Sequence, residues 1–120
     1  MTIRFRLEGI RAEFEGRIED ARILYLQAWE ASRDDFDACV AAHYVARYQG
    51  EPEERFRWNQ EALNRAKAVK DDRVQDFYPS LYLNLGHSCE MLGHQAEAQK
   101  YYKLAAELGV VHQGGQLVRD

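Results

Sequence analysis

The sequence is poor in residues that interrupt helices or cross-link small folds. Its 120 residues include two prolines and only two cysteines, Cys39 and Cys89, which show no pairing pattern. Small secreted domains use cysteines as disulfides, whereas free thiols inside the cell usually behave as small buried apolar groups. We therefore interpret both cysteines as structural residues of a cytoplasmic protein.

Long apolar runs and an excess of positive charge are also missing. No apolar run approaches the roughly 20 residues that span a bilayer, and the N-terminal residues lead into charge rather than into a signal-type stretch. The net charge is −4, and the Lys and Arg residues are dispersed among acids along the chain. Because no basic surface is left to neutralise phosphates, we expect neither nucleic acid nor a membrane as a partner.

What the chain does contain is an abundance of helix formers. Ala, Leu, Glu, Arg, Lys and Gln dominate and β-branched residues are few, and these dominant residues lose least on entering a helix. The length suits a single domain. Apolar periodicity and helix-start residues predict an all-α protein of six helices, at about residues 2–14, 18–31, 35–48, 52–70, 77–92 and 95–108.

Three glycines mark a repeat. Gly16 and Gly50 are 34 residues apart, each lies between two helical stretches, and Gly93 follows 43 residues later. Each glycine is expected to take the positive φ that ends a helix. The longer second interval predicts an insert around residues 70–76 that lengthens the preceding helix and the loop or first turn after it.

Around these glycines, small and aromatic residues recur in register. The third unit carries the fullest set: Tyr82, Leu85, Gly86, Gly93, Ala98, Tyr102 and Ala105. The first unit repeats most of it: Phe5, Gly9, Gly16, Ala21, Tyr25 and Ala28. In the second unit Gly50 and Ala62 fit. The other small and aromatic residues are replaced there by His43, Arg55 and Asn59.

This pattern resembles the tetratricopeptide repeat family over residues 2–108. The resemblance implies a right-handed α–α superhelix, or solenoid, of three helical hairpins in one domain of residues 1–108, with repeats at about 2–34, 35–72 and 77–109 and a tail of residues 109–120. A generic helical bundle with alanine-rich seams is the alternative.

The physical basis of such a pattern is close approach between paired helices. Two antiparallel helices come near each other only where small side chains face one another, here Gly9 against Ala21 in the first unit. The third unit has the same arrangement, and a bulky tyrosine then fills the remaining gap. We expect Tyr25 and Tyr102 to pack across their own hairpins.

The resemblance also implies a function. In that family the first helix of each hairpin lines a concave groove that binds peptides, so we expect a non-enzymatic module that binds a protein or peptide partner. By position, the groove would be lined by Arg6, Ile10, Tyr44, Arg47, Tyr48, Asn84, His87 and Met91. Tyr44 and Tyr48 share a face with Arg47 and would form an interaction platform, or would pack against a neighbouring hairpin instead.

Two further interpretations belong to the same groove. One is a regulatory module that senses a short signalling peptide and acts in trans. The other is recognition of the C-terminal carboxylate of a chaperone tail, which some family members perform with a set of Lys, Asn and Arg residues. That set is largely absent, because only Arg6, Arg47 and Asn84 come close to it.

No motif of a catalytic site is present in the sequence. It contains no Gly-x-Ser-x-Gly nucleophile motif and no Gly-rich phosphate loop, and its four histidines do not converge at metal-ligand spacing. We therefore expect no enzymatic activity, no metal and no cofactor. An enzyme or metal site would have to be assembled from distant residues, for example His43 with His87.

The C-terminal end of the array lacks a predicted capping helix. Residues 109–117 are too few and too rich in glycine for a stable helix, so Tyr101, Leu104 and Leu108 would be left uncovered. We expect this face to be covered by the folded-back tail or by a second copy of the chain in a homodimer.

Overall fold

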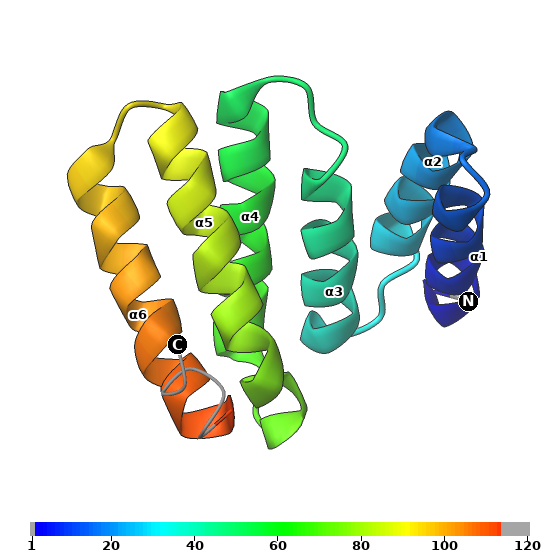
Figure 1. The fold of residues 1–120 in the computed structure, drawn as a ribbon. Coiled ribbons are helices and arrows are strands. Elements are labelled where there is room, and N and C mark those ends of the chain that lie inside the picture. The colour runs from blue at the N-terminus through cyan, green and yellow to red at the C-terminus, as the bar shows by residue number, and fades with distance from the viewer. Residues whose placement is uncertain (1, 114–120) are drawn as a thin grey trace.

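The computed structural model describes the backbone of residues 2–113 and the side chains of residues 3–108. Over these residues the chain forms six α-helices and one 3₁₀ helix and no strand, so the fold is all-α as predicted (Figure 1). None of these helices combines the length and the apolar character that crossing a membrane requires. The helices are α1 (Thr2–Phe14), α2 (Ile18–Glu30), α3 (Asp35–Ala46), α4 (Pro52–Ala68), the 3₁₀ helix η1 (Asp72–Phe77), α5 (Tyr78–Met91) and α6 (Gln95–Gln113).

The helix boundaries agree with those expected from the sequence, with differences in two places. The insert lengthens α4 to 17 residues, but the residues after it form η1, which was not predicted and leads directly into α5. α6 continues to Gln113 rather than ending near residue 108. The predicted packing of the tail involves side chains that lie outside the described residues.

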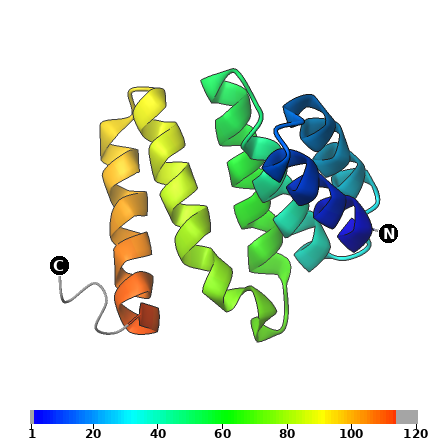
Figure 2. The same cartoon turned by 45° about the vertical axis from the view of Figure 1, so that its right-hand side comes forward.

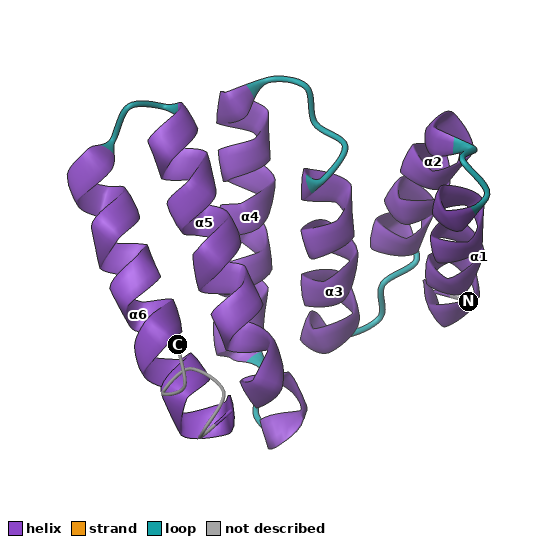
Figure 3. Cartoon of the chain, viewed as in Figure 1, coloured by secondary structure: helices purple, strands orange, loops and turns teal. Residues whose placement is uncertain are grey.

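Consecutive helices pack side by side in the order of the sequence. α1 pairs with α2, α3 with α4, and α5 with α6, while α2 against α3 and α4 against α5 join these hairpins. The first and last hairpins therefore lie at opposite ends of the molecule (Figures 1 and 2). Short loops make most of the connections (Figure 3). Most contacts between helices of the described chain therefore join helices that follow one another in the sequence.

Two of the three repeat glycines end helices in the expected way. Gly16 and Gly93 have φ angles of 81° and 82°, a conformation that glycine adopts without the usual steric cost. Gly50 does not take a positive φ, so the prediction for that turn is wrong. The reason is that the N–H groups of residues 47–49 donate to carbonyls three residues back, which tightens the chain into a 3₁₀-like turn before Gly50 is reached.

Helix starts follow the capping residues. The Asp34 carboxylate accepts a hydrogen bond of 2.8 Å from the N–H of Asp37 and so caps α3. Pro52 lies in the first turn of α4, where a missing N–H costs little. The carboxylate of Asp71 accepts the N–H of Arg73 at 3.0 Å and starts η1.

The first and third hairpins are closed by the same contact. Gly9 faces the ring of Tyr25 so closely that a Cβ at this glycine would lie 2.7 Å from the tyrosine Cε1, and the Tyr25 hydroxyl donates to Glu13 at 2.9 Å. In the third hairpin a Cβ on Gly86 would lie 2.6 Å from Cε1 of Tyr102, whose hydroxyl likewise donates to a glutamate. Both tyrosines pack across their own hairpins, as predicted.

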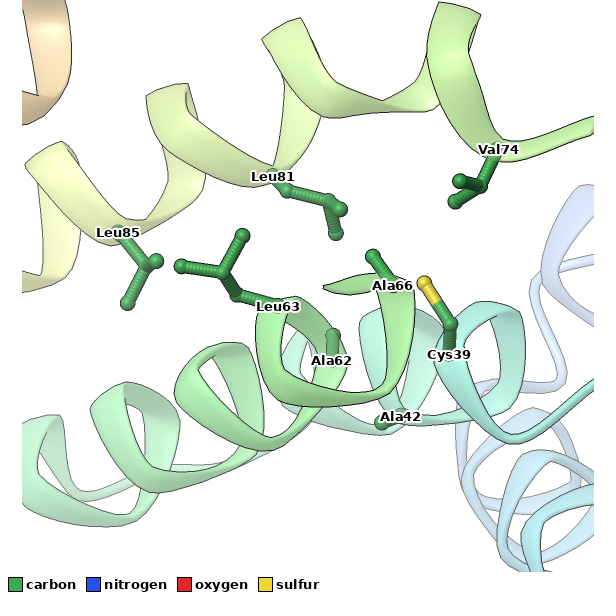
Figure 4. Packing of buried hydrophobic residues seen from close by; sticks show 8 residues of the cluster. All are labelled: Cys39, Ala42, Ala62, Leu63, Ala66, Val74, Leu81 and Leu85. Atoms are coloured by element: carbon green, nitrogen blue, oxygen red, sulfur yellow. The ribbon is translucent and has the colours of Figure 1, made fainter. Parts of the chain in front are cut away.

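The central core joins the second and third hairpins. Its buried residues come from α3, α4, η1 and α5, and Figure 4 shows them together: Cys39, Ala42, Ala62, Leu63, Ala66, Val74, Leu81 and Leu85. Val74 of η1 is buried, so the otherwise exposed insert contributes one side chain to the core. A second cluster joins the first two hairpins and contains Ala12, Ala21, Tyr25 and Val45.

Candidate functional site

Three of the residues expected in the groove surround one pocket. Arg47 follows the end of α3, and Asn84 and His87 lie on α5. The pocket has a volume of about 160 Å³ and is lined by Ala46, Arg47, Arg55, Asn59, Asn84 and His87. Since Arg55 and Asn59 come from α4, the pocket lies where the second hairpin meets the third.

Side-chain hydrogen bonds beside the pocket tie the three helices together. The Asn59 amide nitrogen donates to the Ser88 hydroxyl at 2.9 Å, and this hydroxyl donates to the backbone carbonyl of Asn84 at 2.9 Å. The amide nitrogen of Asn84 lies 3.2 Å from Nδ1 of His43. These bonds join α4 to α5 and α5 to α3, so the lining residues are held by one another.

Two polar atoms of the pocket have no hydrogen-bond partner among the described residues. They are Nε of Arg55 and Oδ1 of Asn59, whose side chain is 3% exposed. The rest of the Arg55 guanidinium is engaged, because Nη2 donates to the carbonyl of Gln49 at 2.9 Å and Nη1 lies 3.4 Å from Sδ of Met91. A buried polar group left unpaired costs about 1–3 kcal/mol and is rare. Both residues line the pocket but both atoms are closed to solvent, so a bound group reaches this donor and this acceptor only when the side chains of Arg55 and Asn59 turn toward it.

His43 enters this network in its neutral form. Its ring packs edge to face on the rings of Phe77 and Tyr44, with centroid distances of 4.7 Å and 5.5 Å. Burial, together with the positive charge of Arg47, lowers the pKa of His43 to about 4. At neutral pH the ring is uncharged, and its Nδ1 accepts the hydrogen bond from Asn84.

Arg47 is held in place by the first hairpin. Its Nη1 lies 2.6 Å from the Glu13 carboxylate, and its guanidinium lies 4.8 Å from the centre of the Tyr44 ring. Partial burial opposes ionisation of Glu13, but hydrogen bonds from Tyr48, Tyr25 and Arg47 outweigh it and hold the pKa of this carboxyl below its usual value. The charge of Arg47 is therefore compensated from within the chain.

Tyr44 and Tyr48 pack against the neighbouring hairpin. Their rings stack on Tyr25 of α2, with centroid distances of 4.7 Å and 5.8 Å, and both side chains are half-buried. Burial and the hydrogen bond to Glu13 raise the pKa of Tyr48 to about 12. Of the two roles that the sequence left open for these tyrosines, the structure supports packing, and a freely exposed platform is not formed.

No family model, curated protein or solved structure matches this chain. The functional argument therefore depends on the residues of the pocket. Sequence reasoning placed three of them in a groove but missed Arg55 and Asn59, and it also missed Ser88, which bonds to Asn59 beside the pocket. The available signal was the departure of the second unit from the repeat pattern at residues 43, 55 and 59, since all three substitutions are polar and all three now lie in or beside the pocket.

The other expected groove residues are distributed over two places. Met91 is exposed and adjoins the pocket through its contact with Arg55. Arg6 and Ile10 belong to α1 and do not line the pocket. Ile10 is exposed on the outer face of α1, away from the side that carries Gly9. The pocket thus uses the second and third hairpins.

The C-terminal face is more covered than expected. Tyr101, Leu104 and Leu108 are all half-buried. Tyr101 stacks on Tyr82 with a centroid distance of 6.1 Å and packs against the central core. Tyr101 is therefore part of the core rather than an open surface, and the large apolar side chains with the highest exposure lie on other helices.

Other candidate sites among the described residues are less suited to a ligand. A larger pocket of about 470 Å³ lies beside the loop between α2 and α3, but its cation, Arg65, is paired with Asp35 at 3.2 Å and with Glu61 at 2.8 Å. In the part of the chain whose side chains are described, no three His, Cys, Asp or Glu residues come together as a metal site would require. His87 is exposed at the pocket, whereas His43 packs inside.

Proposed function

We propose that this chain is a non-enzymatic interaction module, a stack of three tetratricopeptide-like hairpins that binds a peptide segment of a partner protein at the pocket between α3, α4 and α5. The observation that carries the proposal is the pair of atoms without a partner, Nε of Arg55 and Oδ1 of Asn59. An amide group complements both atoms, because its carbonyl oxygen accepts from Arg55 while its N–H donates to Asn59.

The size of the pocket narrows the ligand further. A volume of about 160 Å³ is small beside the roughly 300–1,000 Å³ of sites that enclose a whole small molecule. One side chain of a longer ligand fits this space better than a complete ligand does. Within this proposal, an Asn or Gln side chain of the bound peptide enters the pocket, and the peptide continues over the exposed His87 and Met91 on α5.

The terminal carboxylate of a chaperone tail suits the pocket less well. Of the candidate residues for such recognition, Arg47 is already paired with Glu13 and the amide of Asn84 is bonded to His43. A carboxylate also has no N–H to donate to Oδ1 of Asn59. These contacts favour an internal amide-bearing side chain over a chain terminus.

Selection from a random peptide library displayed on phage tests the proposal. Peptides selected on the wild-type chain should share an Asn or Gln at one fixed position. The Asn59→Leu substitution removes the acceptor with little change in size and should weaken binding of these peptides about tenfold or more, because the bound amide loses a buried partner. Asn64→Leu, at an exposed position of the same helix, is the matched control and should bind like the wild type.

The outcomes of this experiment distinguish an error in the position of the site from an error in the proposed peptide-binding function. Asn59→Leu/Ser88→Ala removes both partners of the Asn59–Ser88 bond and guards against a loss of binding caused by misfolding, which circular dichroism would reveal. Selected peptides that bind Asn59→Leu and Arg55→Met as tightly as the wild type would place the site elsewhere. Selection that enriches no peptide at all would count against peptide binding itself.

A further inference from the structure

Helix α1 is apolar on two opposite faces. One face carries Gly9 and Ala12 and packs against α2. The opposite face carries four large apolar side chains in a row that no described residue buries: Ile3 at 55% exposure, Leu7 at 61%, Ile10 at 40% and Phe14 at 91%. A helix with apolar residues on both sides is characteristic of one packed between two partners, and an exposed apolar stripe marks an interaction site.

The spacing of this stripe is that of a helix-to-helix seam. Its residues are separated by four, three and four positions, which is the spacing of the a and d positions in a coiled coil. The repeat supports the same conclusion. The residue 34 positions after Leu7 is Ala41, which is fully buried in the second hairpin. The position that Leu7 occupies is therefore a packing position in the next unit.

A ridge of alternating charge runs alongside the stripe. It consists of Arg4, Glu8, Arg11 and Glu15, again separated by four, three and four positions. Within the helix, Arg4 pairs with Glu8 at 3.2 Å and Arg11 pairs with Glu15 at 3.2 Å. All four side chains are at least 41% exposed, and Glu15 also pairs with Arg17 at 2.8 Å.

We propose that the occupant of this face is a second copy of the chain, whose α1 lies antiparallel to the first across a two-fold axis. The spacing of the stripe reads the same in both directions, so Ile3 meets the partner's Phe14 and Leu7 meets the partner's Ile10. Read from the C-terminal end, the charged ridge has the opposite order of signs, with a glutamate first where the forward order has an arginine.

In the register set by these apolar contacts, Arg4 lies two positions from the level of the partner's Glu15 and Arg11 two positions from the level of the partner's Glu8, an offset that long side chains can span. Each arginine then has one carboxylate within its own helix and one across the interface. A self-complementary charge order favours another copy of α1 over an unrelated helix. The interface differs from the C-terminal homodimer predicted from the sequence, and it is independent of the peptide pocket.

Sedimentation equilibrium of the 120-residue chain tests the proposal. The wild type should show the mass of a dimer that dissociates on dilution. Leu7→Glu places a charge in the centre of the seam and should give the mass of a monomer. Leu83→Glu is the matched control, because Leu83 is exposed to 49% on α5, outside the stripe, and this variant should remain a dimer.

Charge exchange tests the antiparallel arrangement without altering the apolar seam. Arg4→Glu/Arg11→Glu makes the ridge wholly acidic and Glu8→Arg/Glu15→Arg makes it wholly basic. Each variant alone should be monomeric at concentrations where the wild type is a dimer, and an equimolar mixture should restore the dimer. Since all four positions are exposed, both variants should keep the helix content of the wild type.

Three results would overturn the proposal. One is a wild type that remains a monomer at every accessible concentration. Another is a pair of charge variants that dimerise as well alone as when mixed, since the ridges would then not face each other. A dimer that survives Leu7→Glu would equally show that the contact between copies lies away from α1.

Discussion

At the scale of single residues, the surroundings of His43 change its titration. Its pKa of about 4 in the folded chain lies below the ordinary value of 6.5, because burial and the charge of Arg47 oppose protonation. The unfolded chain therefore binds a proton more readily than the folded one. The stabilisation from a neutral His43 is complete above pH 6.5 and is lost as the pH falls toward 4.

We expect the free energy of unfolding to fall by about 2 kcal/mol between pH 7 and pH 5 through this residue alone. Urea denaturation at a series of pH values measures the change. His43→Gln should lose most of the pH dependence in that range. His94→Gln, at an exposed histidine, should keep it and serves as the control for the carboxyl groups, which both variants share. Equal pH dependence in the two variants would mean that His43 is solvated.

The stacking of Tyr44 and Tyr48 on Tyr25 determines which substitution is suitable for a binding test. From the sequence alone, replacing Tyr44 and Tyr48 by alanine is a direct test of binding. The structure stacks both rings on Tyr25, so these substitutions would also remove packing between the first two hairpins. Asn59 is the better position for a binding test, because it lines the pocket and its Oδ1 has no hydrogen-bond partner.

At the scale of the helical hairpin, the two glycine–tyrosine contacts have the same geometry but differ in how freely the tyrosine ring can move. Tyr25 is fully buried beneath two other rings, whereas Tyr102 is half-exposed. A methyl group on Gly9 would meet a ring that cannot move. A methyl group on Gly86 would meet one that can swing toward solvent.

We therefore expect Gly9→Ala to destabilise the chain by about 2–3 kcal/mol and Gly86→Ala by clearly less, since overpacking opposes the better helix propensity of alanine. Gly50→Ala is the control. No atom lies within 4 Å of a Cβ at Gly50 and its φ is not positive, so its effect should be near zero. Thermal unfolding of the three variants gives the order. Equal losses at positions 9 and 86 would contradict the account.

How far the sequence predicts the fold can be argued from these same elements. The glycine–tyrosine pairs were readable because their contacts lie within one hairpin and repeat at a fixed distance. η1 was not, because its only strong cue, Val74, is a single apolar residue whose burial depends on α3, α4 and α5 all meeting there. The turn at Gly50 was misjudged because a tighter backbone path precedes it.

The pocket was half predictable for a related reason. Positions on the first helices of the second and third hairpins, such as Arg47 and Asn84, follow from the repeat. Arg55 and Asn59 lie on a second helix, which the repeat pattern assigns to packing, and their polarity registered only as a mismatch. Whether a buried polar residue finds a partner is decided by groups outside its own helix, here the Ser88 hydroxyl and the Gln49 backbone carbonyl, which no local pattern specifies.

At the scale of the whole molecule, each helix packs mainly on its neighbours in the sequence. Stability in such a stack is close to a sum of hairpin and interface contributions, so the ends can open without the centre. α6 lies at one end and packs chiefly on α5, whereas α3 lies between α2 and α4. Each of the two thiols lies in one of these regions. Cys89 lies near Glu97 of the terminal helix α6, and Cys39 belongs to the central core.

Thiol labelling should therefore report two opening events. Both thiols are buried, and burial raises the pKa of Cys39 to about 12 and that of Cys89 above its usual value, so neither reacts until the chain around it opens. Cys39→Ala and Cys89→Ala each leave one thiol. The opening free energy from the labelling rate is then compared with the global unfolding free energy of the same variant. The two should agree where only Cys39 remains, whereas opening should cost clearly less where only Cys89 remains. Agreement in both variants would instead show that the three hairpins open as one cooperative unit, which packing between neighbours alone would not explain.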